Sequence, residues 1–168
     1  TLRARNSPVT PIVQEDANTG YDSYEQGRCD AVTSDKSQLA GMRALFANPE
    51  EHVIMEPTIS KEPLGPAVRH GDDQWYDIVF WVVNATFYAE EIGLTSDNID
   101  TFTTSDPEVE RFLGLSGDLG QKLGLDNQWV HRVIKQVGNY GEIFDRNLAQ
   151  LGLPRGLNAQ WTDGGLIY

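Results

Sequence analysis

A short polar run, Thr33-Ser34-Asp35, carries the side chains best placed to bind a small charged ligand. The run follows Ala31-Val32, whose small and β-branched side chains are typical of a covered strand. An acid at the carboxyl end of a strand in an open α/β sheet points into the crevice where such folds bind ligands. Asp35 would supply the anionic group that a cationic ligand needs, and Thr33 and Ser34 would add hydroxyl contacts.

The same residues also suit a structural role. Ser34 or Asp35 could simply cap the helix that follows, because short polar side chains accept hydrogen bonds from the first free backbone N–H groups. That helix is predicted over 37–47, where Leu39, Met42 and Leu45 recur at helical spacing. Residue types alone favour the cap over the ligand contact.

Other residue patterns do not predict a catalytic or metal site. The acid pairs Glu15-Asp16 and Glu90-Glu91 have no apolar setting in the sequence and indicate solvated surface. The three histidines lack metal-ligand spacing, and Cys29 is the single cysteine, so no internal disulfide and no structural zinc are expected. We therefore predict no catalytic residue, no metal ligand and no cofactor.

Composition excludes one large class of partner. The chain of 168 residues has 13 basic and 25 acidic residues and a net charge of −12, which argues against nucleic-acid binding. The longest uncharged apolar stretch, 78–89, is too short to span a bilayer. Residues 1–20 lack the apolar core of a signal peptide.

The predicted helices and strands around this polar run indicate an α/β fold. Short strands are predicted at 12–13, 29–34, 53–55 and 67–69. Helices are predicted at 18–26, 37–47, 72–92, 108–113, 127–137 and 142–148. Alternation of strands and helices over the first third of the chain indicates a parallel or mixed sheet.

The predicted helix 72–92 is apolar nearly all round. Its main stripe comprises Ile78, Val79, Val82, Val83 and Phe87, and the opposite side carries Phe80, Trp81 and Tyr88. Such a helix should be covered on more than one face. The four tryptophans are Trp75, Trp81, Trp129 and Trp161. Because no basic residues lie between the aromatic residues, we expect the tryptophans to pack in a core or between lobes rather than to stack on a nucleic acid.

Four blocks of sequence resemble the periplasmic amino-acid-binding proteins of ABC transporters, of the general L-amino-acid type. They are YEQGRCDAVTSDKSQL, ISKEPLGPAVRHGDDQWYDIV, LGLDNQWVHRVIKQVGNYGEIFDRNL and LPRGLNAQWTDGGLIY. The resemblance covers essentially the whole chain and implies the C-terminal portion of a type II clamp. It implies that residues 1–57 are the remainder of the second α/β lobe, 58–71 the crossover or hinge, and 72–168 the helical part that packs on the first lobe.

This resemblance implies capture of an L-amino acid between two lobes in the periplasm and delivery to permease subunits. Contact with the membrane would be peripheral, through that complex only, and no cofactor is needed. The acid matching Asp35 would hold the ligand's α-ammonium group. The family's carboxylate-binding arginine matches a segment upstream of Thr1, and none of Arg28, Arg69 and Arg155 corresponds to it, so the chain alone is expected to bind amino acids weakly or not at all.

Two rival functions remain open at this point. One is an enzyme on the same fold, such as a cyclohexadienyl-type dehydratase, which would need an acid or base with a shifted pKa in the cleft. The other is a truncated lobe that acts as an interaction module and self-associates through apolar surface exposed on the helix 72–92.

Overall fold

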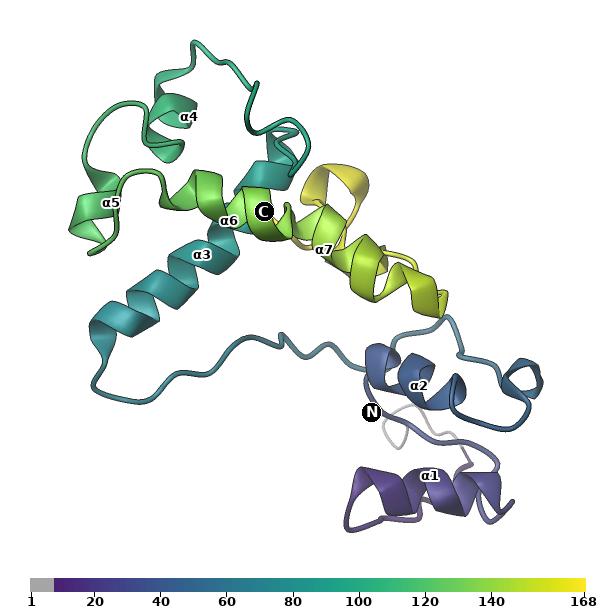
Figure 1. The fold of residues 1–168 in the computed structure, drawn as a ribbon. Helices are drawn as coiled ribbons and strands as arrows, with labels where there is room; N and C mark the ends of the chain where they lie inside the picture. The colour runs from purple at the N-terminus through teal and green to yellow at the C-terminus, as the bar shows by residue number, and fades with distance from the viewer. Residues whose placement is uncertain (1–7) are drawn as a thin grey trace. The chain divides into compact units, whose positions relative to one another are not determined.

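The computed structural model describes residues 8–168, in which helices are joined by irregular segments (Figure 1). The α-helices are α1 (Ala17–Glu25), α2 (Lys36–Arg43), α3 (Asp73–Glu91), α4 (Pro107–Phe112), α5 (Leu119–Lys122), α6 (Trp129–Val137) and α7 (Tyr140–Asn147). Short 3₁₀ turns lie at η2 (Pro49–Glu51), η3 (Ala149–Leu151), η4 (Gly156–Asn158) and η5 (Trp161–Asp163). The chain divides into two compact units, one running to Leu64 with Leu151–Leu153, the other comprising Gly65–Gln150 and Pro154–Tyr168.

The predicted strands do not form within residues 8–168, where the only ladder contact is an isolated bridge between Gln160 and Ile167. The segments at 12–13, 29–34, 53–55 and 67–69 lack paired neighbours, and several of their apolar side chains are exposed, Val13 at 90% and Val53 at 78%. A strand needs a neighbouring backbone to satisfy its N–H and C=O groups, and no segment of the described chain pairs with these.

In the first unit, two short helices carry a small core. Asp16 caps α1 by accepting from the Thr19 backbone N–H at 3.0 Å, and Gly27 ends the turn with φ of 69°. Tyr21 on α1 and Ala40 on α2 are buried. The prediction of helices at 18–26 and 37–47 is therefore confirmed to within a few residues.

A small aromatic group adds to this unit. The Tyr24 hydroxyl lies 2.8 Å from His52 Nδ1, and the His52 ring lies 4.7 Å from the ring of Phe46, centroid to centroid. These contacts hold the segment after η2 against α1 across 28 residues of sequence. His52 is thus explained by packing rather than by metal binding.

The second unit is organised around α3, which matches the predicted helix 72–92. Asp72 begins it by accepting from the Trp75 backbone N–H at 3.1 Å. Only the C-terminal half is fully covered, at Ala85, Thr86 and Ala89. The core that covers it contains Ala89, Leu94, Ile99, Val109, Leu113, Val130 and Ile134.

The other helices of this unit supply the core. Val130 and Ile134 on α6 are fully buried, with Trp129 and Val133 packed beside them, as the sequence pattern predicts. The helix α5 was not predicted, because it has four residues, includes Gly120 and is too short to show a hydrophobic period. Trp75, Trp81 and Trp161 are exposed by 52%, 52% and 60%, so they lie outside the core of the second unit, and packing between lobes stays a prediction for them.

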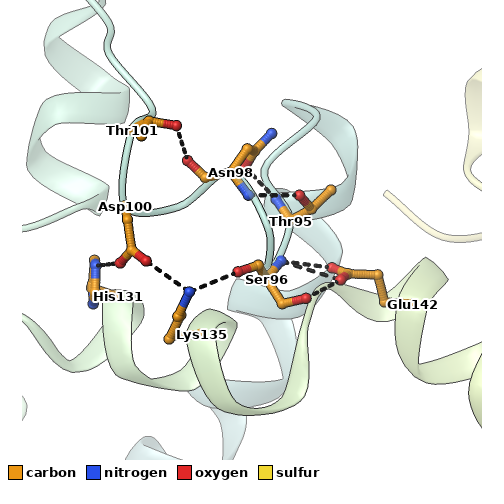
Figure 2. Close-up of polar contacts among 8 residues, drawn as sticks. All are labelled: Thr95, Ser96, Asn98, Asp100, Thr101, His131, Lys135 and Glu142. Carbon is orange, nitrogen blue, oxygen red and sulfur yellow. Dashed lines mark hydrogen bonds and ion pairs between the residues drawn. The ribbon is translucent and has the colours of Figure 1, made fainter.

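One carboxylate joins the end of α3 to the start of α7. Glu142 accepts from the Ser96 backbone N–H at 3.1 Å, from the Ser96 hydroxyl at 2.5 Å and from the Asn139 backbone N–H at 2.8 Å (Figure 2). In return, Asn139 accepts from the Glu142 backbone N–H, which completes a capping box. The Asn139 amide also donates to the Leu94 carbonyl at 2.8 Å.

A second polar link joins the loop after α3 to α6. Asp100 accepts from Lys135 at 2.7 Å and lies 3.1 Å from His131 Nε2, while Lys135 also reaches the Ser96 carbonyl (Figure 2). The hydrogen bond from Lys135 holds the pKa of Asp100 below its ordinary value. These groups are exposed, so the link orients the loop and adds little to stability.

Replacing Asn139 should destabilise the second unit. Asn139→Ala removes the cap of α7 and leaves the buried Leu94 carbonyl without its donor, so we expect a loss of about 2–3 kcal/mol. Urea unfolding followed by circular dichroism measures it. The matched control is Asn147→Ala at the exposed end of the same helix, where only a bond to the Ile143 carbonyl is lost and the change should stay below about 0.5 kcal/mol. Equal losses for both variants would contradict this account.

The pKa of Glu142 gives a pH prediction. Burial raises this pKa, but the hydrogen bonds from Ser96 and Asn139 outweigh burial, and the net pKa is lowered. A carboxyl whose folded pKa is depressed stabilises the fold above its unfolded pKa of about 4.3, and that stabilisation is lost as pH falls through the folded pKa.

Wild type should therefore exceed Glu142→Gln in stability by about 1 kcal/mol at pH 7, and the difference should shrink below about pH 4.3. Urea midpoints at a series of pH values test this. A difference that stays constant down to pH 3 would show that the charge of Glu142 plays no part.

Candidate ligand-binding site

Asp35 stands at the first turn of α2 with its carboxylate exposed and without a capping hydrogen bond. Its backbone is extended, with φ of −58° and ψ of 138°, and its carbonyl accepts from the Leu39 N–H at 2.9 Å. Asp35 therefore occupies the N-cap position while its side chain does not cap. The backbone carbonyl of Asp35 makes the first hydrogen bond of the helix, and the Asp35 carboxylate is available to another partner.

Ser34 and Thr33 lie beside Asp35 in the extended segment that leads into α2. The Ser34 hydroxyl donates to the Gln38 side-chain oxygen at 2.5 Å, so it is engaged within the first turn of the helix. Thr33 is exposed. The structure thus places the three predicted residues on one short exposed stretch, with Asp35 the most available of them.

The cation next to Asp35 is held elsewhere. Lys36 donates its ammonium group to the Glu56 carbonyl at 2.7 Å, which ties the start of α2 to the segment after 53–55. This contact, across 20 residues, was not predicted, because nothing in the sequence marks which carbonyl a lysine will reach. Because Lys36 makes this contact, its ammonium group does not neutralise the Asp35 carboxylate.

Two hollows of the described surface are lined by residues other than Asp35. In the first unit a hollow of about 330 Å³ is lined by Arg43, Pro49, Glu50, His52, Val53 and Ile54. In the second unit an apolar hollow of similar size lies between α3 and α6 and includes Val82, Leu125, Trp129 and Val133. Neither is lined by Thr33, Ser34 or Asp35, so the described residues do not by themselves enclose a ligand there.

Arg155 has a structural partner. Its guanidinium lies 2.8 Å from the Glu90 carboxylate, with both side chains about one-fifth exposed, and it packs over the rings of Tyr140 and Phe144. Glu90 is therefore half of an internal ion pair rather than the solvated acid expected from the sequence. The guanidinium of Arg155 is therefore engaged within the second unit.

The polar residues of Figure 2 include charged side chains of the second unit that satisfy one another. Glu142 is saturated by Ser96 and Asn139, and Asp100 by Lys135 and His131. In residues 8–168, no group of three or more His, Cys, Asp or Glu side chains is arranged to hold a metal ion. No helix of the described chain is long and apolar enough to cross a membrane.

Comparison with known proteins gives close relatives. The chain is 49% identical over 99% of its length to the general L-amino acid-binding periplasmic protein AapJ of Rhizobium johnstonii. It is 48% identical to the glutamate/glutamine/aspartate/asparagine-binding protein BztA of Rhodobacter capsulatus, and 43% identical to the putative amino-acid ABC transporter-binding protein YhdW of Escherichia coli K12. It spans about half the length of these relatives, 51%, 51% and 50%.

A solved structure agrees with them. A periplasmic binding protein of an ABC transporter from Brucella ovis, with glutathione bound, superimposes with a TM-score of 0.88 at 47% identity, over 99% of this chain and 54% of that one. No protein-family profile matches the chain.

These findings define the class of protein. The chain has the fold of part of a periplasmic binding protein. More narrowly, it is homologous over nearly all of its 168 residues to periplasmic amino-acid-binding proteins of ABC transporters. The predicted resemblance and the partial clamp fold are confirmed, while the individual strand assignments are wrong within the described residues.

Proposed function

We propose that this chain forms part of the substrate-binding component of an amino-acid importer of the ABC type, acting in the periplasm. Its role is capture rather than catalysis, with delivery to permease subunits. The observation that carries this proposal is the 43–49% identity to amino-acid-binding relatives across almost the whole chain, together with an exposed carboxylate at Asp35.

Asp35 is the residue proposed to hold the ligand. Free amino acids and glutathione share an ammonium group beside a carboxylate, and an exposed carboxylate is the natural partner of the ammonium group. The charge of Asp35 is committed neither to capping α2 nor to Lys36, so binding would not require an existing contact to break. Thr33 is proposed as an adjoining hydroxyl contact, and Ser34 as another once its bond to Gln38 is exchanged.

Polar residues at the edge of one lobe do not by themselves bind an amino acid tightly. The ligand's carboxylate needs a cation or a helix N-terminus, and the guanidinium of Arg155 is already paired with the Glu90 carboxylate. We propose that the carboxylate is bound by the part of the fold that this chain does not span. Closure would then be favoured because the ligand bridges both parts.

The dehydratase alternative has less support. The relatives are described as binding proteins, and the carboxyl groups of the second unit whose pKa is shifted are engaged in helix capping or ion pairs, namely Glu142, Asp100 and Asp126. A general acid or base poised for catalysis would be free to exchange its proton with a substrate. We therefore propose that the protein is not an enzyme.

The site prediction is tested in a chimera in which this chain replaces the matching half of the Rhizobium johnstonii relative. Titration calorimetry with L-glutamate should detect binding. Asp35→Asn should weaken it at least about 30-fold, because a bound ammonium would be left without its counter-charge. The matched control is Asp30→Asn, an exposed acid five residues earlier, which should change affinity less than twofold.

Two outcomes would count against the proposal. Binding by the chimera that is unchanged in Asp35→Asn would remove the site assignment. A folded chimera that binds no amino acid, beside an unmodified relative that does, would remove the capture function itself.

A further inference from the structure

Lys36 is the first residue of α2, where its charge is unfavourable for the helix itself. The N-terminus of a helix carries partial positive charge, so acids rather than lysines are favoured in the first turn. The first turn of α2 contains no acidic residue. The Lys36 ammonium group instead donates to the Glu56 carbonyl at 2.7 Å, across 20 residues of sequence. A charge-assisted hydrogen bond to another segment is therefore what a lysine contributes at this position.

The start of α2 has few other contacts to fix it. The helix has eight residues, of which Ala40 alone is buried, and it contains Gly41, which weakens a helix interior. The Asp35 side chain makes no capping hydrogen bond, and the other hydrogen bonds at this end are local to it. Within residues 8–168, the side-chain hydrogen bond that joins the first turn of α2 to a distant segment is the one from Lys36 to Glu56.

This bond bears directly on the proposed ligand contact, because Asp35 immediately precedes Lys36. If the first turn of α2 frays, the Asp35 carboxylate occupies many positions, and binding must then order it. A carboxylate held in one place beforehand binds an ammonium group without that loss. Tying the first turn to Glu56 would hold it so.

We propose that Lys36 is a positioning residue for ligand binding. Its bond to the Glu56 carbonyl fixes the start of α2 and, through it, the place at which the Asp35 carboxylate meets the ligand's ammonium group. This inference rests on the proposed function of Asp35, and Lys36 itself touches no ligand atom.

Simple electrostatics predicts an effect of the opposite sign. A lysine beside Asp35 repels the ammonium group of a ligand, so removal of its charge alone would strengthen binding. Removal of the bond to Glu56 would weaken binding, because the carboxylate loses its fixed position. The direction of the change in affinity therefore separates positioning from charge.

The test uses the chimera described above, with titration calorimetry on L-glutamate and L-glutamine. Lys36→Met should weaken the binding of both ligands by about the same factor, roughly fivefold. Lys36→Arg keeps a cationic donor that can reach the same carbonyl, so its affinities should stay within about twofold of the parent. The matched control is Lys61→Met, an exposed lysine elsewhere in the first unit, which should also change affinity less than about twofold.

A double-mutant cycle tests whether Lys36 acts through Asp35. In the Asp35→Asn background, Lys36→Met should change affinity less than about twofold, because there is no longer a carboxylate to position.

Hydrogen exchange gives a readout that does not depend on the ligand. The Leu39 N–H bonds the Asp35 carbonyl at the start of α2. In the ligand-free chimera its exchange should be at least about threefold faster in Lys36→Met than in the parent, and near the parent rate in Lys36→Arg.

Three results would overturn the inference. They are tighter binding by Lys36→Met, an equal loss in the Asp35→Asn background, and a loss confined to L-glutamate, which would mean that Lys36 contacts the ligand's side-chain carboxylate. Failure of the proposed function is distinguishable from these. It would appear as no effect of Asp35→Asn, whereas a clear effect of Asp35→Asn with none of Lys36→Met removes the positioning role alone.

Discussion

The burial of only half of α3 is the constraint on which the rest of this structure depends. Its C-terminal half is packed by α6 and α7 and by the loop that follows it, and the Glu142 capping box closes that junction. Its N-terminal half projects aromatic side chains that nothing in the second unit covers. One helix therefore contributes both to the internal core of the unit and to its exposed aromatic surface.

Incomplete burial is also seen in the segments predicted as strands, which remain unpaired among residues 8–168. The extended segments of the first unit expose valine and methionine side chains, Val13, Val53 and Met55, that suit a covered strand. They have no ladder partner among residues 8–168. A sheet forms only when neighbouring strands are present together, so a portion of an α/β fold can keep its helices while its strands stay unpaired.

The proposed capture function follows the same division. Asp35 supplies one charge at the start of a helix whose own polar needs its backbone already meets. A zwitterionic ligand carries a second charge that needs a complementary group on another surface. Affinity and closure then arise together, because a ligand that bridges two bodies stabilises the arrangement in which both are close. Firm internal packing of the second unit would let it move as one body.

The sequence by itself determined the longer helices and the family, because hydrophobic period and motif order are local or linear signals. Asp72 begins α3 and Gly27 follows the end of α1, as their residue types predict, whereas the cap that Asp16 provides for α1 was not predicted. Only the tertiary structure decided that Asp35 does not cap, that Arg155 pairs with Glu90, and that Ser96 satisfies Glu142 across 46 residues. It also left the predicted strands unpaired and the tryptophans exposed, because pairing and burial depend on which other surfaces are present, and no local pattern records that.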